Sequence, residues 1–462
     1  MEFIVQLISR AYGLLWGDLF TLPLPGGGSI GLSLLVLLLI PTGIFFTIRT
    51  RFLPVRLFPE MLRLTVEKRG TDGSAISGLQ ALVISTATRV GMGNLIGVVA
   101  AISAGGAGAV FWMWLSALIG SSTAFVEATL AQLHKQPDPL YGGYRGGPAY
   151  YIHDFLAKGR RKSLIAVLFA ISGLICWCGI SQVISNSVSS AFYNAFSVPP
   201  LYTTVALVAV SAVIVLRKHA TVKVLDVLVP IMAGCYFLMT IFLIVKNAAL
   251  LPSVFSQIFE EAFGIRQAVA GGFGAVLMQG VKRGLFSNEA GSGSAPCAAA
   301  AADITHPAKA GLLQAFGVFL DTIVICSCTA MIMLLTPAEK IAGLSGMDLL
   351  QTAMDYHLGS FGVVFIALIL LLFSFSTFIG VLFYARSNVA YLFGDNWASQ
   401  TAYKILALVM LFVGGLAAYT FVWDLGDVGI GLMTVFNIAV ILPMSREALA
   451  SLREYESLRK KR

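Results

Sequence analysis

Long apolar runs recur along the chain and restrict the folds that it can adopt. Eleven such runs, bounded by charged or turn residues, lie at about residues 29–48, 77–104, 109–133, 163–192, 201–216, 224–245, 262–284, 310–335, 359–385, 402–420 and 428–445. A helix needs roughly 20 apolar residues to cross the ~30 Å hydrocarbon core of a bilayer. Because 57% of the residues are hydrophobic and only 12% are charged, we expect an all-α polytopic protein embedded in a lipid bilayer.

Basic residues between the runs predict the orientation of the spans. When alternate connections are assigned to one side, that side holds 26 of the 31 Lys and Arg residues, the other side holds four, and Arg89 lies within a span. Lys and Arg concentrate in cytoplasmic loops, so we expect the N-terminus outside and the C-terminus in the cytoplasm. The same count places Lys282 and Arg283 at the cytoplasmic mouth, and it explains the formal charge of +8 without a nucleic-acid partner.

The order of the spans predicts two opposed repeats. Residues 1–22 are amphipathic and are expected to lie at the membrane interface, and one extra span follows them. The other ten spans divide into two groups of five, which start on opposite sides of the membrane because five is odd. We therefore expect an N-terminal region over residues 1–76, repeats over 77–250 and 251–445, and a basic cytoplasmic tail over 446–462.

Glycine-rich stretches interrupt the first span of each repeat. They are TRVGMGN at residues 88–94 and AGGFGAV at residues 270–276. Glycine tolerates backbone angles that other residues resist, and inverted-repeat transporters bind substrate and ion where two broken helices meet near the bilayer midplane. Half-helix N-termini suit a carboxylate and unwound carbonyls suit a cation, so the pattern favours a small zwitterion bound with Na⁺ or H⁺. The alternative is that these glycines only permit close helix packing.

Two ionisable residues, Arg89 and Asp321, lie nearest the middle of their spans. A charge at membrane depth is costly when unpaired, so each is expected to be paired or functional. One hypothesis is a direct Arg89–Asp321 ion pair, and the other is that Asp321 binds a cation or a proton. Glu127, near the end of its span, is expected to be structural.

Several motifs together resemble the alanine or glycine:cation symporter (AGCS) family, the sodium:alanine symporters. They are GLQALVISTATRVGMGNLIGVVAAISAGGAGAVFWMWLSALIGSSTAFVEATLA with the downstream YRGGPAYYI, QGVKRGLFSNEAGSGSAPCAAAAA at residues 279–302, and DTIVICSCTA at residues 321–330. RVGMGN and GGFGAV are also similar to the broken-helix motifs of sodium-coupled symporters with the LeuT fold. The resemblance implies a LeuT-type 5+5 inverted-repeat fold with one extra N-terminal span in a prokaryotic inner membrane. It also implies uptake of a small neutral amino acid by symport with Na⁺ or H⁺, without a cofactor.

The resemblance further implies which residues contact the substrate. They are Gly91, Met92, Gly93, Asn94, Gln182, Gly272, Phe273, Gly274, Thr377 and Val381. Backbone groups at 91–93 would hold the carboxylate, and the Phe273 ring would cover the apolar side. For Gln182, the alternative is hydrogen bonding between helices. The family commonly has tryptophan or asparagine where Val381 stands, so a larger neutral amino acid such as glutamine is also compatible with this sequence.

The fold resemblance places a cation between the first and eighth helices of the repeats. Its expected ligands are the carbonyl groups of Ala87, Val90 and Phe373 and the hydroxyl groups of Ser376 and Thr377. Such an all-oxygen set without a formal charge suits Na⁺ better than a transition metal. Hydroxyls in membrane helices also bond the carbonyl of the preceding turn, which is the alternative reading of both hydroxyls.

Two other functions share this composition. An uncoupled facilitator has the same pattern of spans, because coupling to an ion is not visible in residue spacing. A membrane-embedded hydrolase would need a serine or metal constellation with suitably placed bases. All five histidines fall in loops or at span ends, so the hydrolase is the less favoured alternative.

Overall fold

The structure, a computed structural model, describes residues 2–23, 29–67, 76–157, 162–217, 221–265, 272–417 and 419–460. The described chain is mainly helical, as expected. Its short strands pair as β1 (Phe20–Pro23) with β2 (Ser29–Leu32), β3 (Ile76–Ser77) with β6 (Ala302–Asp303), and β4 (Gln136–Pro137) with β5 (Tyr144–Arg145).

Helices form in each of the predicted regions. The N-terminal region has α1 (Glu2–Trp16), α2 (Leu34–Arg49), α3 (Leu53–Arg56) and α4 (Phe58–Thr65). The first repeat region has α5 (Gly78–Arg89), η1 (Gly93–Gly97), α6 (Val98–Gly105), α7 (Gly108–Leu133), α8 (Pro148–Ala157), α9 (Leu164–Phe196), α10 (Pro200–Val215) and α11 (Thr221–Lys246).

The second repeat region contains longer helices and more short connecting ones. They are η2 (Ala248–Leu250), α12 (Leu251–Ala262), α13 (Gly272–Asn288), α14 (Ala295–Ala301), α15 (Pro307–Val318), η3 (Phe319–Cys326), α16 (Ser327–Leu334), α17 (Ala338–Ile341), α18 (Gly346–Leu358), α19 (Ser360–Phe393), α20 (Trp397–Gly414) and α21 (Tyr419–Lys460). The last helix continues through most of the expected tail.

Many of these helices are long and apolar enough to cross a membrane. Among the described residues, seven qualify, and the bent pair α5 and η1–α6 makes an eighth; α2 and α10 are shorter apolar helices. Every predicted run contains a helix. The least accurate prediction is the run at 262–284, because α12 ends at Ala262 and the next helix begins only at Gly272.

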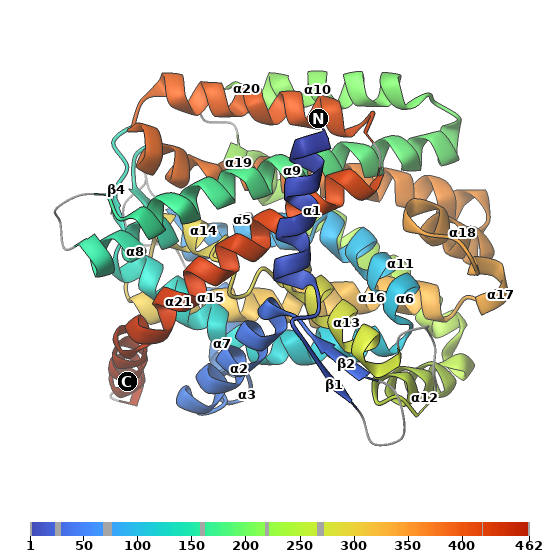
Figure 1. Ribbon diagram of the computed structural model, residues 1–462, viewed down its shortest axis with the longest axis horizontal. Coiled ribbons are helices and arrows are strands. Elements are labelled where there is room, and N and C mark those ends of the chain that lie inside the picture. The colour runs from blue at the N-terminus through green and yellow to red at the C-terminus, as the bar shows by residue number, and fades with distance from the viewer. Residues whose placement is uncertain are drawn as a thin grey trace.

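Two groups of helices pack around α5. The long helix α9 packs against α19, α20 and α21, whereas α7 packs against α2, α13 and α15. The helix α5 contacts α19, α11, α14 and α15, and so joins the two groups. Figure 1 shows α10 beside α20 along one edge of the molecule and α1 lying across α21.

Local sequence signals explain where α5 begins. The Ser77 hydroxyl accepts from the backbone N–H of Gln80 at 3.1 Å, and the Gln80 side chain accepts from the backbone N–H of Ser77 at 3.0 Å. This capping box satisfies donors that a helix start leaves free. It directs the chain into the helix that carries the first glycine-rich break.

Candidate functional site

The first predicted break is present. Helix α5 ends at Arg89, the chain resumes as η1 at Gly93, and the two helical segments are bent by 48°. The backbone N–H of Gly91 donates to the carbonyl of Arg89 at 2.8 Å rather than continuing the α-helical ladder to Ala87. Residues 90–94 are all buried. The break therefore exposes peptide groups inside the protein, where only protein or a ligand can bind them.

Helix α19 places two hydroxyl groups against this break. The Ser376 and Thr377 hydroxyls each lie 3.3 Å from the Ala87 carbonyl oxygen. They also bond the Phe373 carbonyl oxygen, at 2.8 and 2.9 Å. Four of the five predicted cation ligands thus lie together, and the bonds to Phe373, in the preceding turn of the same helix, are those of the alternative predicted for both hydroxyls. Within the described chain neither hydroxyl bonds the fifth, the Val90 carbonyl oxygen.

The approach of α19 requires glycine at position 91. A Cβ atom built on Gly91 would lie 1.9 Å from Thr377 Oγ1, which is far inside van der Waals contact. Further along α19, a Cβ atom on Gly380 would lie 2.4 Å from the Thr88 methyl group, and the Tyr384 hydroxyl hydrogen-bonds the Thr88 hydroxyl at 2.6 Å. These contacts hold the hydroxyl pair in register with the break.

A buried carboxylate ties the break to α13 and η3. Asp321 Oδ1 accepts from Asn94 Nδ2 at 2.7 Å, and Oδ2 accepts from the hydroxyls of Ser287 and Thr322 at 2.7 and 2.8 Å. Asp321 and Asn94 are both 0% exposed. Asp321 lies in the π-helix η3, and π-bulges are frequent at functional sites. The Asn94 carbonyl accepts from Thr329 at 2.6 Å.

The predicted ion pair between Arg89 and Asp321 is not formed. Arg89 donates from Nη1 to the Gln314 side-chain oxygen at 3.1 Å and to its carbonyl oxygen at 3.3 Å. Among the described residues, the salt bridges do not include Arg89. Asp321 is satisfied by neutral donors instead, so the two intramembrane charges belong to separate hydrogen-bonded groups.

The second break lies later in the sequence than predicted. Helix α13 is continuous from Gly272 to Asn288, so the described part of the expected break, residues 272–276, is helical, and residues 270 and 271 lie outside the described chain. The non-helical segment is 289–294, between α13 and α14. Glu289, Gly291 and Gly293 have φ values of 57°, 92° and 84° there. The signal for it was the sequence NEAGSG.

Phe273 and its two glycines are therefore misplaced for substrate contact. The Phe273 ring packs edge-on against Trp112, with centroids 5.7 Å apart. Ser287, which meets Asn94, lies 14 residues further along α13, or about 21 Å at the helical rise of 1.5 Å per residue. Phe286 and Ser287, rather than Gly272, Phe273 and Gly274, are the α13 residues beside Gly93.

Lys282 and Arg283 were counted in a connection between spans at the cytoplasmic mouth, and this prediction is wrong because both lie inside a helix. Both are buried inside α13 and pair with Asp427 of α21, at 2.7 and 3.5 Å. Lys282 also hydrogen-bonds the Tyr12 hydroxyl of α1, and the Trp16 indole donates to the Asp427 carbonyl at 3.0 Å. The charge count failed here because it took the end of an apolar run as the end of a helix.

Gln182 contacts a neighbouring helix through its amide nitrogen, while its amide oxygen bonds none of the described residues. Its amide nitrogen lies 3.2 Å from the Met410 sulfur on α20. The Gly414 backbone packs so closely on Gln182 that a Cβ atom there would lie 2.2 Å from its Cα. One turn further on, Asn186 donates to the Ala417 carbonyl at 2.8 Å. The structure matches the interhelical alternative for Gln182.

Val381 is buried on α19, one turn beyond Thr377.

Glu127 holds the second break in place. Its Oε1 accepts from the backbone N–H of Gly291 at 3.2 Å, and its Oε2 accepts from Asn437 Nδ2 at 2.8 Å. The same Asn437 nitrogen donates to the Gly291 carbonyl at 2.9 Å, and the Tyr151 hydroxyl bonds the Asn437 oxygen. The structural role predicted for Glu127 is thus specific, since it clamps unwound backbone.

This arrangement of membrane helices with unwound segments is a LeuT-type fold. Solved structures similar to the chain include MhsT in complex with L-phenylalanine (TM-score 0.57, 14% identity, 82% of this chain and 89% of that chain covered). Another is a manganese transporter of Eremococcus coleocola (TM-score 0.52, 15% identity, 82% and 81% covered). At these identities the likeness concerns the fold alone, and it confirms the predicted fold class.

Sequence comparisons give the family. Residues 28–462 match the family model described as "Sodium:alanine symporter family", and the chain belongs to this family. Relatives include the "Probable sodium/glutamine symporter GlnT" of Bacillus subtilis, 43% identical over 93% of this chain and 89% of the relative. The "Sodium/alanine symporter AgcS" of Methanococcus maripaludis is 33% identical over 92% and 95%. The predicted family is confirmed, and the chain is a transporter.

Proposed function

We propose that this transporter imports a small neutral amino acid, from alanine to glutamine in size, together with Na⁺ or H⁺. The observation that carries the proposal is the convergence of the Ala87 carbonyl and the Ser376 and Thr377 hydroxyls beside the Gly91 break. Carbonyl and hydroxyl oxygens without a formal charge suit Na⁺. Relatives named for sodium/alanine and sodium/glutamine symport support the same substrate class.

The substrate carboxylate binds at the start of η1 in this proposal. Backbone N–H groups at a helix start carry partial positive charge and lack helical partners. Gly93 lies there, buried, with Phe286 beside it, and the next N–H, that of Asn94, donates to the Gly91 carbonyl at 3.2 Å. Phe286 therefore replaces Phe273 as the aromatic residue that covers the substrate. The small side chain at Val381 leaves room for an amino acid larger than alanine.

Asp321 couples the ion to the substrate site. Its carboxylate connects Asn94 of the first break with Ser287 at the end of α13, just before the second break. A cation or proton at this carboxylate changes the bonds that both breaks share. The two breaks then respond together, which alternating access around a fixed site requires.

Orientation follows from the corrected charge count. Without Lys282 and Arg283, the side of the membrane with most of the basic loop residues still holds 24 of them, and the other side holds four. The N-terminus is therefore outside and the C-terminus in the cytoplasm of a prokaryotic inner membrane. Because Tyr12 of α1 contacts Lys282, the Lys282–Asp427 pair lies on the outer side of the breaks.

The test is uptake by purified protein in proteoliposomes. Labelled alanine, glycine and glutamine are supplied under an imposed Na⁺ gradient, an imposed H⁺ gradient, or none. We expect at least one of these amino acids to accumulate inside the vesicles above its outside concentration when a gradient is imposed, and none to do so without a gradient. Counterflow exchange without gradient-driven accumulation would instead identify an uncoupled facilitator.

A further inference from the structure

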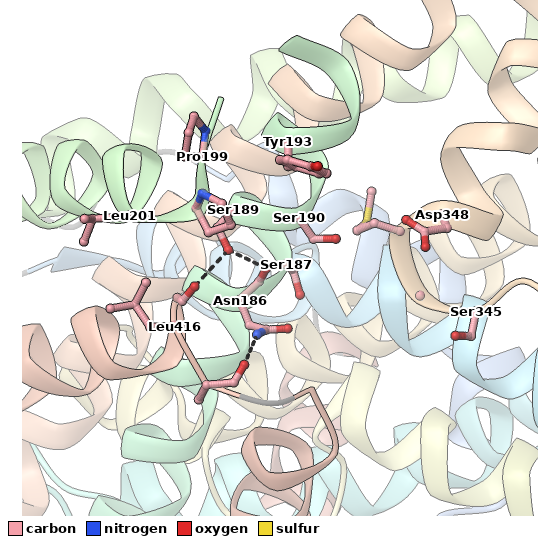
Figure 2. A pocket seen from close by; sticks show the side chains of 15 residues that line it. Asn186, Ser187, Ser189, Ser190, Tyr193, Pro199, Leu201, Ser345, Asp348 and Leu416 are labelled. Carbon is pink, nitrogen blue, oxygen red and sulfur yellow. Dashed lines mark hydrogen bonds between the residues drawn. The ribbon is translucent and has the colours of Figure 1, made fainter. Parts of the chain in front are cut away.

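A basic pocket of about 330 Å³ lies between the end of α2, the turn into α3 and the C-terminal part of α21. Four arginines and one acidic residue among its described lining give it a formal charge of +3; they are Arg49, Arg51, Arg56, Arg453 and Glu456. A cavity of about 740 Å³ at the C-terminal end of α9 differs, because the described residues that line it include Asp348 and no Lys or Arg (Figure 2). Of these two pockets, the basic one therefore suits an anion.

Only one of the four arginines is neutralised within the described chain. Arg56 Nη2 lies 2.7 Å from the Glu456 carboxylate. Arg49, Arg51 and Arg453 form no salt bridge with any described residue. A guanidinium group presents its N–H donors in a planar fork that matches the oxygens of a phosphate group. Three uncompensated guanidinium groups around one pocket therefore favour a ligand that carries a phosphate.

The turn between α2 and α3 exposes a basic and an aromatic side chain next to each other. Arg51 and Phe52 have φ values of 57° and 55°, which residues other than glycine rarely adopt. Phe52 is 61% exposed, and Arg51 is exposed as well. Segments at the membrane interface combine basic residues, which meet lipid headgroups, with apolar residues that enter the hydrocarbon. This composition places the pocket at the depth of the lipid headgroups.

An apolar groove of about 310 Å³ begins at the residue before Arg56. Val55 and residues of α4, α7, α15 and η3 line it. Among the described lining residues only Ser121 is polar, and its hydroxyl donates to a carbonyl of its own helix at 2.8 Å. Val55 is 73% exposed and Leu118 is 44% exposed. The groove therefore suits a hydrocarbon chain, and it shares α3 as a wall with the basic pocket.

We propose that the basic pocket and the apolar groove together bind one anionic phospholipid. The phosphate lies among the guanidinium groups of Arg49, Arg51 and Arg453, and one acyl chain lies in the groove along Val55. Basic pockets between membrane helices on the cytoplasmic side bind anionic headgroups. The formal charge of the pocket favours a headgroup with a net negative charge over a zwitterionic one. The choice of the cytoplasmic leaflet rests on the proposed orientation, whereas the binding itself does not.

The experiment compares two lipids that differ only in their headgroups. Full-length protein, delipidated in detergent, is titrated with phosphatidylglycerol or with phosphatidylcholine of the same acyl chains, and native mass spectrometry counts the bound lipids. We expect the first phosphatidylglycerol to bind wild-type protein at least tenfold more tightly than phosphatidylcholine. The variant Arg49→Gln, Arg51→Gln, Arg453→Gln should lose this preference. The control Arg10→Gln, Lys340→Gln, Lys460→Gln removes the same charge from exposed positions outside the pocket and should keep it.

A second variant tests the groove and leaves every charge in place. Val55→Trp should fill the groove and weaken the binding of phosphatidylglycerol at least threefold. Val213→Trp, at a position of α10 that is 60% exposed, is the matched control and should bind as wild-type protein does. Equal affinities of wild-type protein for the two lipids, or a preference that persists in the triple arginine variant, would overturn the inference. Unchanged binding by Val55→Trp would exclude the groove as the site of the acyl chain and would likewise refute the combined site.

Discussion

Asn94 donates a 2.7 Å hydrogen bond to the carboxylate of Asp321, and both side chains are fully buried. Asn94 belongs to the first helix break and Asp321 to the π-helix η3, 227 residues further along the chain. Ser287 bonds the other carboxylate oxygen. A single acidic group therefore joins three helices at the point where the first helix is unwound, and changes at this group are expected to alter transport.

Asp321→Asn tests the coupling role. The amide keeps the shape of the carboxylate but carries no charge, and one hydrogen-bond donor then faces the donors of Asn94 or Ser287. Hydrogen bonds to charged groups contribute about 1.5–3 kcal/mol each, so we expect ion-driven accumulation to fall at least tenfold. Gradient-driven uptake and counterflow are measured side by side. Full accumulation by this variant would contradict the role, and Asp355→Asn serves as the control.

Ser376→Ala with Thr377→Ala tests the cation site. Each substitution removes one oxygen ligand, and a loss of about 1.4 kcal/mol per ligand corresponds to a tenfold change in affinity. We expect the Na⁺ concentration for half-maximal uptake to rise at least tenfold. Ser374→Ala is the matched control, because Ser374 is buried on the same helix and its hydroxyl bonds none of the described groups. Unchanged Na⁺ dependence in the double variant would remove the assignment.

Gly91→Ala tests the close approach of α19 to the break. The new methyl group would overlap Thr377 Oγ1, and overpacking of this kind destabilises by about 1–3 kcal/mol. We expect a lower melting temperature and reduced uptake. Gly97→Ala is the control, since a Cβ atom there would have no atom of the described chain within 4 Å outside the adjoining residues and the backbone of its own helix. It should be neutral or stabilising by up to about 1 kcal/mol, because alanine is the better helix former. Equal effects at the two positions would argue against this geometry.

Glu127→Ala tests the clamp on the second break. It leaves the Gly291 N–H and one Asn437 N–H buried without the acceptor they have now. Unsatisfied buried donors cost about 1–3 kcal/mol each, so we expect a clear loss of thermal stability and of uptake. Glu127→Gln keeps one acceptor and should lose less. The exposed Glu454→Gln is the control, and a Glu127→Ala protein as stable as this control would refute the clamp.

The Lys282–Asp427–Arg283 cluster gives an asymmetric prediction. Asp427→Ala leaves two buried cations without their anion, and breaking a buried ion pair in this way costs about 3–5 kcal/mol. Lys282→Met should cost less, because Arg283 remains 3.5 Å from Asp427 and the methionine stem fills the same space. The partly exposed pair Arg56–Glu456 is the reference, where Arg56→Gln should change stability by about 1 kcal/mol. The melting temperature of each variant is measured in detergent, and we expect the largest decrease for Asp427→Ala, a smaller one for Lys282→Met and the smallest for Arg56→Gln.

The sequence alone determined the class of protein. Apolar runs of membrane length predicted the helices, because hydrocarbon permits few other structures, and the basic residues between them predicted an orientation. The glycines at 88–94 predicted the first break, whereas the meeting of Ala87 with Ser376 and Thr377 was predicted from the resemblance to symporters with the LeuT fold. Motifs then indicated the family, which the comparisons confirmed.

Only the tertiary structure decided which second break faces the first. Two glycine-rich stretches, at 270–276 and 289–294, compete in the sequence, and local composition cannot rank them. Packing of α13 beside η1 brings Ser287 rather than Phe273 to Asn94. Likewise, Arg89 binds Gln314, Lys282 binds Asp427 and Gln182 faces Met410. Partners of buried polar groups lie hundreds of residues away, so they depend on how helices rotate and slide against one another, which span patterns do not encode.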